Sequence, residues 1–336
     1  MNVSLMLPSL FAVVLAAVLS AGVIVAIRPL LLRHALAKPN ARSSHRVPTP
    51  QGAGFAVIIA TLAVAGVVIA SVGSNDARLP ATVFAATAFI ALVGATDDIR
   101  TIPVIPRLIL QGLSVGAVLA ATSGGLRILP GCPLWIEQAV LFLAGLWFVN
   151  LVNFMDGIDW MTVAEVVPIT AALVLLGAFG DLPPSAMIAA AALGGATLGF
   201  APFNRPVAKI FLGDVGSLPI GLLLGWCLLE LATRQHLAAA LLLPLYYLAD
   251  ATVTLLRRLA KRETVWAAHR SHFYQRATDN GFSVLRVVGE VFALNFGLAA
   301  LAVASAMTTS WMVNVSLLVI GAGAVTLLLL RFSRKR

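Results

Sequence analysis

Residues 52–73 read GAGFAVIIATLAVAGVVIASVG, an apolar run without a single charged side chain. A helix of about 20 such residues is long enough to cross the hydrocarbon core of a bilayer. Similar runs recur along the whole chain, and we expect eleven transmembrane helices. Their approximate ranges are 6–27, 52–73, 79–96, 104–122, 135–154, 161–179, 184–202, 217–233, 237–257, 284–306 and 311–331. The sequence therefore predicts an all-α polytopic membrane protein.

The composition supports this class, because 60% of the 336 residues are hydrophobic and only 11% are charged. Soluble domains carry about 25% charged residues and about 45–50% apolar ones. So few charges cannot cover a water-exposed surface, which excludes a soluble globular fold and a disordered chain alike. No Lys or Arg precedes Arg28, so the first span lacks the basic region of a cleaved signal peptide. We expect one membrane domain over 1–336, of which 284–336 form two C-terminal helices and a basic tail.

Basic residues concentrate on one side of the predicted membrane. Of the 23 Lys and Arg residues, 20 lie in the loops after the first, third, seventh and ninth spans and in the C-terminal tail. The positive-inside rule then predicts an N-terminus outside the cell and a cytoplasmic C-terminus. The net charge of +9 is therefore explained mainly by the orientation of the protein in the membrane, and a nucleic-acid partner is not needed to explain it. Ten of the 14 acidic residues lie at the same ends, which indicates a functional site on the cytoplasmic face.

The first cytoplasmic loop contains KPNARSSHRVPTPQGAG at 38–54. Its prolines favour an extended backbone, and its basic and hydroxyl side chains suit a phosphate group. The candidate contacts are Lys38, His45 and Arg46. A positive loop that merely attracts anionic lipid explains the same residues equally well.

Two acidic segments follow the third and fifth spans. Asp97 and Asp98 are adjacent carboxylates, which repel each other unless a cation or a donor compensates; the alternative is a helix N-cap beside a solvated neighbour. Asn153, Asp156 and Asp159 have no basic residue near them in the sequence. Oxygen ligands of this kind select Mg²⁺, which is typically shared with substrate phosphates. Plain turn chemistry is the alternative for the second segment.

Two further segments follow the seventh and ninth spans. The sequence GDVGS at 213–217 opens a helix, where free N–H groups beside a carboxylate can hold a metal against phosphate, or where Ser217 simply caps the helix. The sequence HRSHFYQR at 269–276 contains His-X-X-His, but no third ligand for zinc accompanies it. Binding of a diphosphate by the guanidinium groups of its arginines explains this segment better than zinc binding does. A solvated basic loop is the alternative.

Taken together, these five segments resemble the polyprenyl-phosphate N-acetylhexosamine-1-phosphate transferases, glycosyl transferase family 4. More narrowly, they resemble the bacterial undecaprenyl-phosphate branch that initiates O-antigen and related glycans. The resemblance runs in order over residues 38–277 and implies transfer of a sugar-1-phosphate from a UDP-linked N-acetylated sugar to undecaprenyl phosphate, with loss of UMP. It also implies a requirement for Mg²⁺, with Mn²⁺ as a substitute, and an eleven-helix fold. The location would be the bacterial inner membrane, and the role lipopolysaccharide or cell-wall biosynthesis.

The resemblance also implies a role for each matching residue. Asp97 and Asp98 match the catalytic aspartate pair, and Asp214 matches the metal-binding aspartate, with Asn153 beside it. The matches to substrate-binding positions are Asp156 and Asp159 near the nucleotide and metal, Asn204 and Phe211 near the uridine, and His269, Arg270, His272 and Arg276 in the loop for diphosphate and sugar. The chain departs from the family pattern at Gln51, where a basic residue is common, and at Ala53 and Trp160, where glycine is common.

The predicted reaction is a single in-line displacement in which Asp97 or Asp98 positions or deprotonates the lipid phosphate. A covalent aspartyl-phosphate intermediate is the rival mechanism. A secondary transporter is the alternative from another class, although the middles of the spans carry almost no charge. A non-catalytic protein that binds polyprenyl lipid is a further alternative. The sequence leaves the sugar and the oligomeric state open, and a homodimer is one option.

Overall fold

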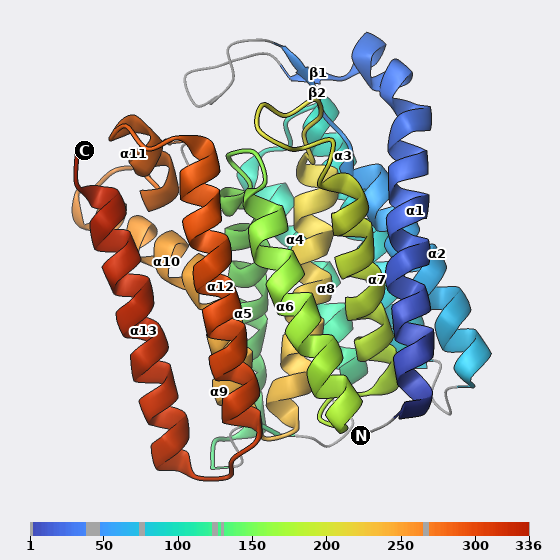
Figure 1. Cartoon of the computed structure of the whole chain (residues 1–336), viewed down its shortest axis with the longest axis vertical. Coiled ribbons are helices and arrows are strands. Elements are labelled where there is room, and N and C mark those ends of the chain that lie inside the picture. The colour runs from blue at the N-terminus through green and yellow to red at the C-terminus, as the bar shows by residue number, and fades with distance from the viewer. Residues whose placement is uncertain are drawn as a thin grey trace.

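The computed structural model describes residues 3–37, 48–73, 78–122, 127–128, 131–264 and 269–335, which form a bundle of long helices (Figure 1). Its elements are α1 (Val3–His34), β1 (Leu36–Ala37), β2 (Thr49–Pro50), α2 (Gly54–Val72), α3 (Arg78–Ile99), α4 (Val104–Thr122), α5 (Leu134–Met155), α6 (Met161–Phe179), α7 (Pro184–Phe200), α8 (Asp214–Thr233), α9 (Leu237–Leu242), α10 (Leu245–Ala260), α11 (Phe273–Asp279), α12 (Val284–Ala306) and α13 (Trp311–Ser333). The two strands pair as a short antiparallel ladder. The predicted all-α class is confirmed.

Nine helices in the described part of the chain are long and apolar enough to cross a membrane. They are α1 to α6, α8, α12 and α13. Helix α7 is equally apolar but has 17 residues, the lower limit for a span. Outer helices expose large apolar side chains, such as Leu92, Val319 and Leu327, as expected where lipid replaces water. A multi-pass membrane protein is therefore confirmed, while the number eleven and the orientation of the termini stay predictions.

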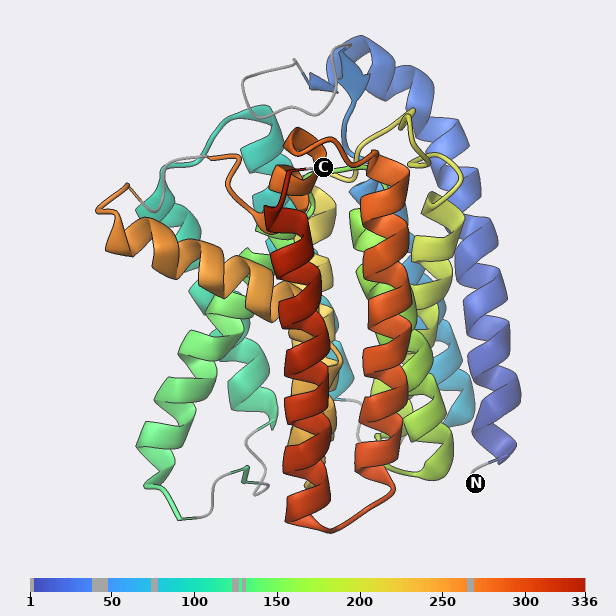
Figure 2. The ribbon, with the colours of Figure 1, turned by 60° about the vertical axis from the view of Figure 1, so that its left-hand side comes forward.

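The predicted ninth span, 237–257, is two helices rather than one. Helix α9 stops at Leu242, and α10 starts at Leu245, directly after Pro244. Proline has no N–H to donate, and its ring clashes with the preceding turn, so it separates the two helices. Helix α10 then leaves the direction of the bundle and runs outward (Figure 2). Its inner face buries Asp250 and Thr254, whereas Leu256 and Leu259 are exposed. The prediction of a single span here is wrong because hydropathy alone ignores the proline.

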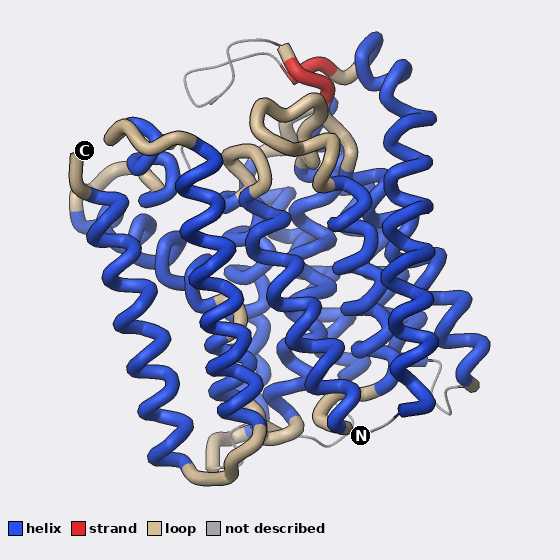
Figure 3. Tube along the Cα trace, in the orientation of Figure 1, coloured by secondary structure: helices blue, strands red, loops and turns tan. Residues whose placement is uncertain are grey.

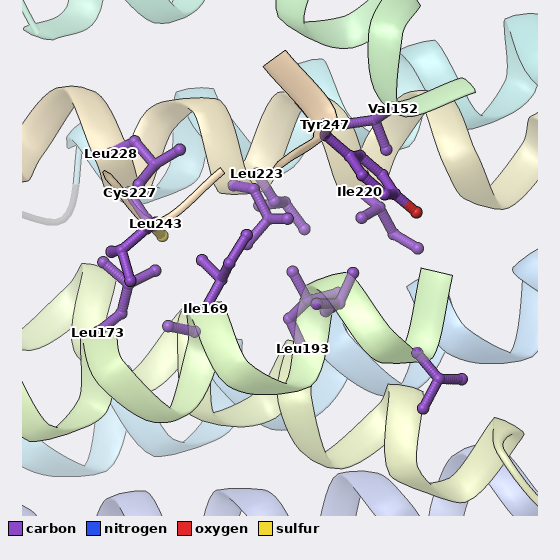
Figure 4. Packing of buried hydrophobic residues seen from close by; sticks show 14 of the residues in the cluster. Val152, Ile169, Leu173, Leu193, Ile220, Leu223, Cys227, Leu228, Leu243 and Tyr247 are labelled. Atoms are coloured by element: carbon purple, nitrogen blue, oxygen red, sulfur yellow. The ribbon is translucent and has the colours of Figure 1, made fainter. Parts of the chain in front are cut away.

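Helices α6, α7 and α8 form the centre of the bundle, where most of their residues are buried. Figure 4 shows Ile169 and Leu173 of α6 facing Leu223 and Cys227 of α8. Helix α7 approaches α1 closely, because a Cβ atom on Gly195 would lie 2.1 Å from the carbonyl oxygen of Val13. Small residues that let helix backbones approach are the usual means of packing helices within lipid.

The two ends of the chain lie at opposite ends of the bundle (Figure 1), as an odd number of crossings requires. The strands and the connections from α5 to α6 and from α7 to α8 gather at the end that holds the C-terminus (Figure 3). Helix α11 lies at that end as well. The polar segments identified in the sequence are therefore collected at one end of the bundle.

Candidate active site

Backbone hydrogen bonds join the start of α2 to the connection between α7 and α8. The N–H of Phe211 donates to the carbonyl oxygen of Pro50 at 2.8 Å, and the N–H of Gly54 donates to that of Leu212 at 2.9 Å. Gly54 also packs against the α8 backbone, since a Cβ atom there would lie 2.3 Å from the nitrogen of Gly216. The first and fourth polar segments therefore form one unit, with half-buried Phe211 at its centre.

Asp98, near the end of α3, caps the N-terminus of α8. Its Oδ1 accepts the N–H of Asp214 and its Oδ2 the N–H of Val215, both at 3.0 Å, and Gln51 Nε2 donates to Oδ1 at 2.5 Å. The first N–H groups of a helix lack partners within the helix and favour an anion. Gly213 adopts a φ of 81°, which glycine tolerates and which brings these groups onto Asp98. The sequence suggested free N–H groups at this helix start, and in the structure these two donate to a carboxylate of the chain. Binding of metal and phosphate by this segment stays a prediction.

Asp97 has a different environment from its neighbour. Its Oδ2 forms an ion pair with Arg107 Nη1 at 2.7 Å, and its Oδ1 accepts the N–H of Ile102 at 2.6 Å. The side chain is only 5% exposed. Asp97 therefore ties the end of α3 to the start of α4 with its charge balanced by Arg107, whereas the described contacts of Asp98 are with neutral donors.

The predicted metal-binding pair lies together. The amide nitrogen of Asn153, near the end of α5, donates to Asp214 Oδ1 at 2.8 Å and to Ser217 Oγ at 2.9 Å. Asp214 is the first residue of α8 and Ser217 lies one turn later. The amide thus links α5 to α8 beside the carboxylate of Asp98.

Asp156 follows α5, and its Oδ1 accepts a hydrogen bond from the hydroxyl of Thr162. Burial raises the pKa of Asp156 from 3.8 to about 6, with smaller upward contributions from the charges of Asp98 and Asp159, while the Thr162 hydroxyl lowers it. The charge of Asp98 acts on both Asp156 and Asp214, and that of Asp97 acts on Asp98 and Asp214. Because Asp97 is paired with Arg107, we group the other three carboxylates, Asp98, Asp156 and Asp214, and call them the aspartate cluster.

The charge of the aspartate cluster fits a divalent cation. None of its three carboxylates forms an ion pair with any residue that the structure describes, and such uncompensated charge at a membrane boundary is costly. The same residues do not form a complete metal site, because no group of three or more His, Cys, Asp or Glu in the described ranges is arranged to hold a metal. Both carboxylate oxygens of Asp98 already accept backbone N–H groups of α8. Because the described residues supply too few free ligands, Mg²⁺ would need substrate phosphate and water as its further ligands.

Asp159 and Asn204 shape the connection between α7 and α8. Asp159 Oδ2 accepts the N–H of Ala208 at 2.9 Å. Asn204 accepts the N–H of Trp160 at 2.7 Å and donates to the carbonyl oxygen of Ile210 at 3.0 Å. Both side chains are buried. Their contact with substrate stays a prediction, and the described contacts show them organising this loop.

Asp250 anchors the start of α11. This fully buried carboxylate accepts the N–H groups of Phe273 at 3.0 Å and Tyr274 at 3.2 Å, and it lies 3.2 Å from His272 Nδ1. A carboxylate only accepts, so His272 Nδ1 carries a hydrogen. The rings of His272 and His269 lie 4.9 Å apart. Asp250 therefore pairs with the histidine segment and fixes the start of α11.

Helix α11 contacts the Asp156 segment. Tyr274 Oη donates to the carbonyl oxygen of Phe154 at 3.1 Å, and a Cβ atom on Gly157 would lie 2.1 Å from that hydroxyl. The arginines of this region have local partners. Arg270 contacts Asp279 at 3.1 Å, and the guanidinium of Arg276 lies 6.0 Å from the ring centre of Phe273. The histidine segment and the aspartate cluster are thus connected through α11.

Three predicted contacts, Lys38, His45 and Arg46, lie outside the described residues and stay predictions. Three partners of the carboxylates were missed from the sequence, namely Gln51, Arg107 and Thr162. Gln51 donates to a residue 47 positions away, so no local pattern identifies it. Arg107 and Thr162 lie ten and six residues after their partners and were visible only as a basic loop residue and an ordinary helix residue.

Comparison with known proteins finds related sequences. The model of the family Glycosyl transferase family 4 matches residues 80–232. A probable undecaprenyl-phosphate N-acetylglucosaminyl 1-phosphate transferase of Bacillus subtilis is 26% identical over 89% of this chain and 87% of the relative. A decaprenyl-phosphate N-acetylglucosaminephosphotransferase of Mycobacterium leprae is 27% identical over 81% and 76%. A phospho-N-acetylmuramoyl-pentapeptide-transferase of Nostoc punctiforme is 32% identical over 46% and 48%.

The matched range contains Asp97, Asp98, Asn153, Asp156 and Asp214. It therefore includes the aspartate cluster and the helices that position it. The sequence motifs, the all-helical membrane fold and these relatives agree with one another. Residues 80–232 thus match the model of glycosyl transferase family 4, and most of the chain is similar to polyprenyl-phosphate N-acetylglucosamine-1-phosphate transferases.

Proposed function

We propose that the protein transfers an N-acetylated sugar-1-phosphate from a UDP-sugar to undecaprenyl phosphate and releases UMP. The observation that carries this proposal is the aspartate cluster, Asp98, Asp156 and Asp214, at one end of a bundle of membrane helices. A phosphate on a membrane lipid lies at that level, where a water-soluble nucleotide can also reach it. The proposed face is the cytoplasmic face of the bacterial inner membrane, in accord with the 20 basic residues on that side.

The reaction needs compensation of negative charge, because a phosphate attacks a diphosphate. Asp214 and Asn153 are the residues proposed to hold Mg²⁺, with Asp156 beside them. When bound, the cation would offset the charge of the two phosphates and of the departing UMP. His269 and His272, in the segment that Tyr274 joins to the end of α5, are proposed to bind the diphosphate. Because Asp250 engages Nδ1 of His272, this ring would donate to the diphosphate through Nε2 as an imidazolium. A phosphomonoester has a second pKa of about 6, so the acceptor needs little help to lose its proton.

Asp98 is the stronger candidate for positioning the lipid phosphate or accepting its proton. Asp97 is held by an ion pair with Arg107 at 2.7 Å and by the N–H of Ile102 at 2.6 Å, so both of its oxygens serve the junction of α3 and α4. Asp98 has only neutral donors among its described partners. The proposed chemistry is one in-line displacement without a phosphorylated enzyme.

An apolar cavity supports the proposed acceptor. It has a volume of about 210 Å³ and lies between α4, α5, α8 and α9. Its lining includes Leu119, Phe148 and Leu241, which suit part of a hydrocarbon chain. The proposed product is a lipid-linked sugar diphosphate, which is the first intermediate of a cell-envelope glycan such as O-antigen.

The test is transfer of ³²P from a panel of β-labelled UDP-sugars to undecaprenyl phosphate by the purified protein, with and without EDTA. We expect label in the lipid for at least one N-acetylated sugar, loss of activity with EDTA and recovery with Mg²⁺ or Mn²⁺. Enzyme incubated with donor alone should remain unlabelled, and stoichiometric label on an aspartate would contradict the single displacement. Transport of UDP-sugar into vesicles without transfer, or lipid binding without UMP release, would replace the proposal by one of its rivals.

A further inference from the structure

The two C-terminal helices enclose a second cleft, separate from the aspartate cluster. Helices α12 and α13 run side by side (Figure 2), and the cleft between them has a volume of about 710 Å³. At its mouth lie Arg331, Arg334 and Lys335, and deeper in the bundle its walls are Leu294, Ala324 and Leu328. The cleft is thus basic at one end and apolar along its length.

Helix α13 places the basic end of the cleft at the level of the lipid headgroups. It begins at Trp311, which is 70% exposed, and tryptophan is enriched at membrane interfaces. Arg331 follows 20 residues later, which corresponds to about 30 Å along a helix, the thickness of the hydrocarbon core. Leu327 is 70% exposed beside the cleft, so the apolar walls are open to the lipid chains.

The guanidinium of Arg331 is held in place before any ligand binds. Its Nε and Nη2 donate to the carboxylate of Glu290 at 2.8 and 2.9 Å, and it also lies 5.7 Å from the ring centre of Phe282. Glu290 contacts Arg286 as well, at 3.0 Å. A single carboxylate therefore serves two arginines, and the mouth of the cleft keeps a positive charge.

Arg334 and Lys335 add to this charge. Neither forms an ion pair with any residue of the described ranges, although both line the cleft. We propose that the cleft binds an anionic phospholipid of the surrounding bilayer, with the phosphate at Arg331, Arg334 and Lys335 and an acyl chain along Leu294, Ala324 and Leu328. Charge complementarity at the mouth and an apolar path of membrane depth together favour this occupant.

The cleft is connected to the histidine segment. Asn280, directly after α11, donates from Nδ2 to the carbonyl oxygen of Phe332 at 2.8 Å, and the rings of Phe282 and Phe332 are 5.9 Å apart. A phospholipid held between α12 and α13 would therefore stabilise the segment that fixes the end of α11. The proposal itself concerns binding and does not depend on the proposed transferase function.

The first experiment tests the basic mouth by native mass spectrometry of the delipidated full-length protein in detergent. Dioleoyl phosphatidylglycerol and dioleoyl phosphatidylcholine are titrated separately. We expect tighter binding of phosphatidylglycerol, weakened about tenfold or more by the double substitution Arg334→Gln/Lys335→Gln. The matched control is Arg28→Gln/Arg33→Gln, which removes two exposed basic residues from α1. An equal loss in both double variants would mean unspecific attraction to a basic surface and would overturn the proposal.

The second experiment tests the apolar walls with charges unchanged. Ala324→Phe fills the cleft, whereas Ala322→Phe places the same ring on the exposed side of α13. We expect phosphatidylglycerol binding to fall with Ala324→Phe only. Farnesyl phosphate is added as a competitor for the bound phospholipid. If farnesyl phosphate displaces it at lower concentration than phosphatidylglycerol itself does, the cleft is a polyprenyl-phosphate site and the proposed occupant is wrong. If both phenylalanine variants bind phosphatidylglycerol like the unchanged protein, the cleft does not hold an acyl chain.

Discussion

The aspartate cluster and the carboxylates at the opposite end of the helix bundle have different kinds of partner. At the end that holds the N-terminus, Glu137 pairs with Arg127 at 2.9 Å and Asp181 lies 3.3 Å from His236. At the other end, the described donors to the aspartate cluster are amides, a hydroxyl and backbone N–H groups. Glu137 and Asp181 thus lie beside a basic side chain of the protein, whereas the described donors to the aspartate cluster are all neutral. In the proposed function, the metal and the substrate would compensate the charge of the cluster.

The largest effect is expected from Asp214→Asn. Removing its charge should reduce transfer by about 10³-fold, in the range seen when an electrostatic group of an active site is lost. Sugar transfer is measured per folded molecule, with folding checked by thermal unfolding in detergent. The matched control is Glu137→Gln at the opposite end, which should lower the unfolding temperature and keep kcat. A fully active Asp214→Asn, or an inactive but folded Glu137→Gln, would break the contrast between the two ends.

The neighbouring residues Asp97 and Asp98 should affect different quantities in the same assays, Asp97 the stability and Asp98 the activity. Asp98→Asn should lower kcat by about 10²-fold. Arg107→Gln should act mainly on folding, because it leaves the buried Asp97 carboxylate without its partner, at a cost of about 3 kcal/mol. Unfolding temperature and kcat are measured for both variants. If Arg107→Gln lowers kcat as strongly as Asp98→Asn without loss of stability, Asp97 is not a structural residue.

Asp156→Asn is expected to stabilise the protein in the absence of metal. The folded-state pKa of about 6 lies above the ordinary value of 3.8, so folding disfavours the ionised form. This penalty is absent below pH 4, grows between pH 4 and 6 and reaches about 3 kcal/mol above pH 6, at ~1.4 kcal/mol per pH unit. The gain in unfolding temperature should therefore be largest at pH 7 to 8 and smaller at pH 5. A gain that is independent of pH would show that ionisation of Asp156 is not its cause.

The smallest effect is expected from His236→Ala. The pair with Asp181 is partly exposed, with 19% and 28% of the side chains accessible, and such pairs contribute at most about 1 kcal/mol. Transfer activity should be unchanged because the pair lies at the end away from the aspartate cluster. A large loss of activity would mean that the two ends are coupled.

Much of this architecture could be predicted from composition and motifs. Runs of apolar residues locate the helices, and the asymmetric distribution of charge collects the polar segments at one end. The break before α10 was missed although Pro244 is visible, because a window of hydropathy averages over it. The cap that Asp98 places on α8 was missed for another reason. Its partners are the backbone N–H groups of residues 116 and 117 positions away, and backbone groups carry no signature in a sequence.

The cap that Asp98 places on α8 has a consequence for turnover. The N-terminus of a helix is a common binding site for phosphate. In this protein the carboxylate of Asp98 already occupies the N-terminus of α8. In the proposed reaction, a diphosphate at the aspartate cluster would meet an acidic surface and would be held there by the cation that it shares with the protein. The released nucleotide could not rebind to the first N–H groups of α8, because Asp98 occupies them, so its release would not require these groups to become free.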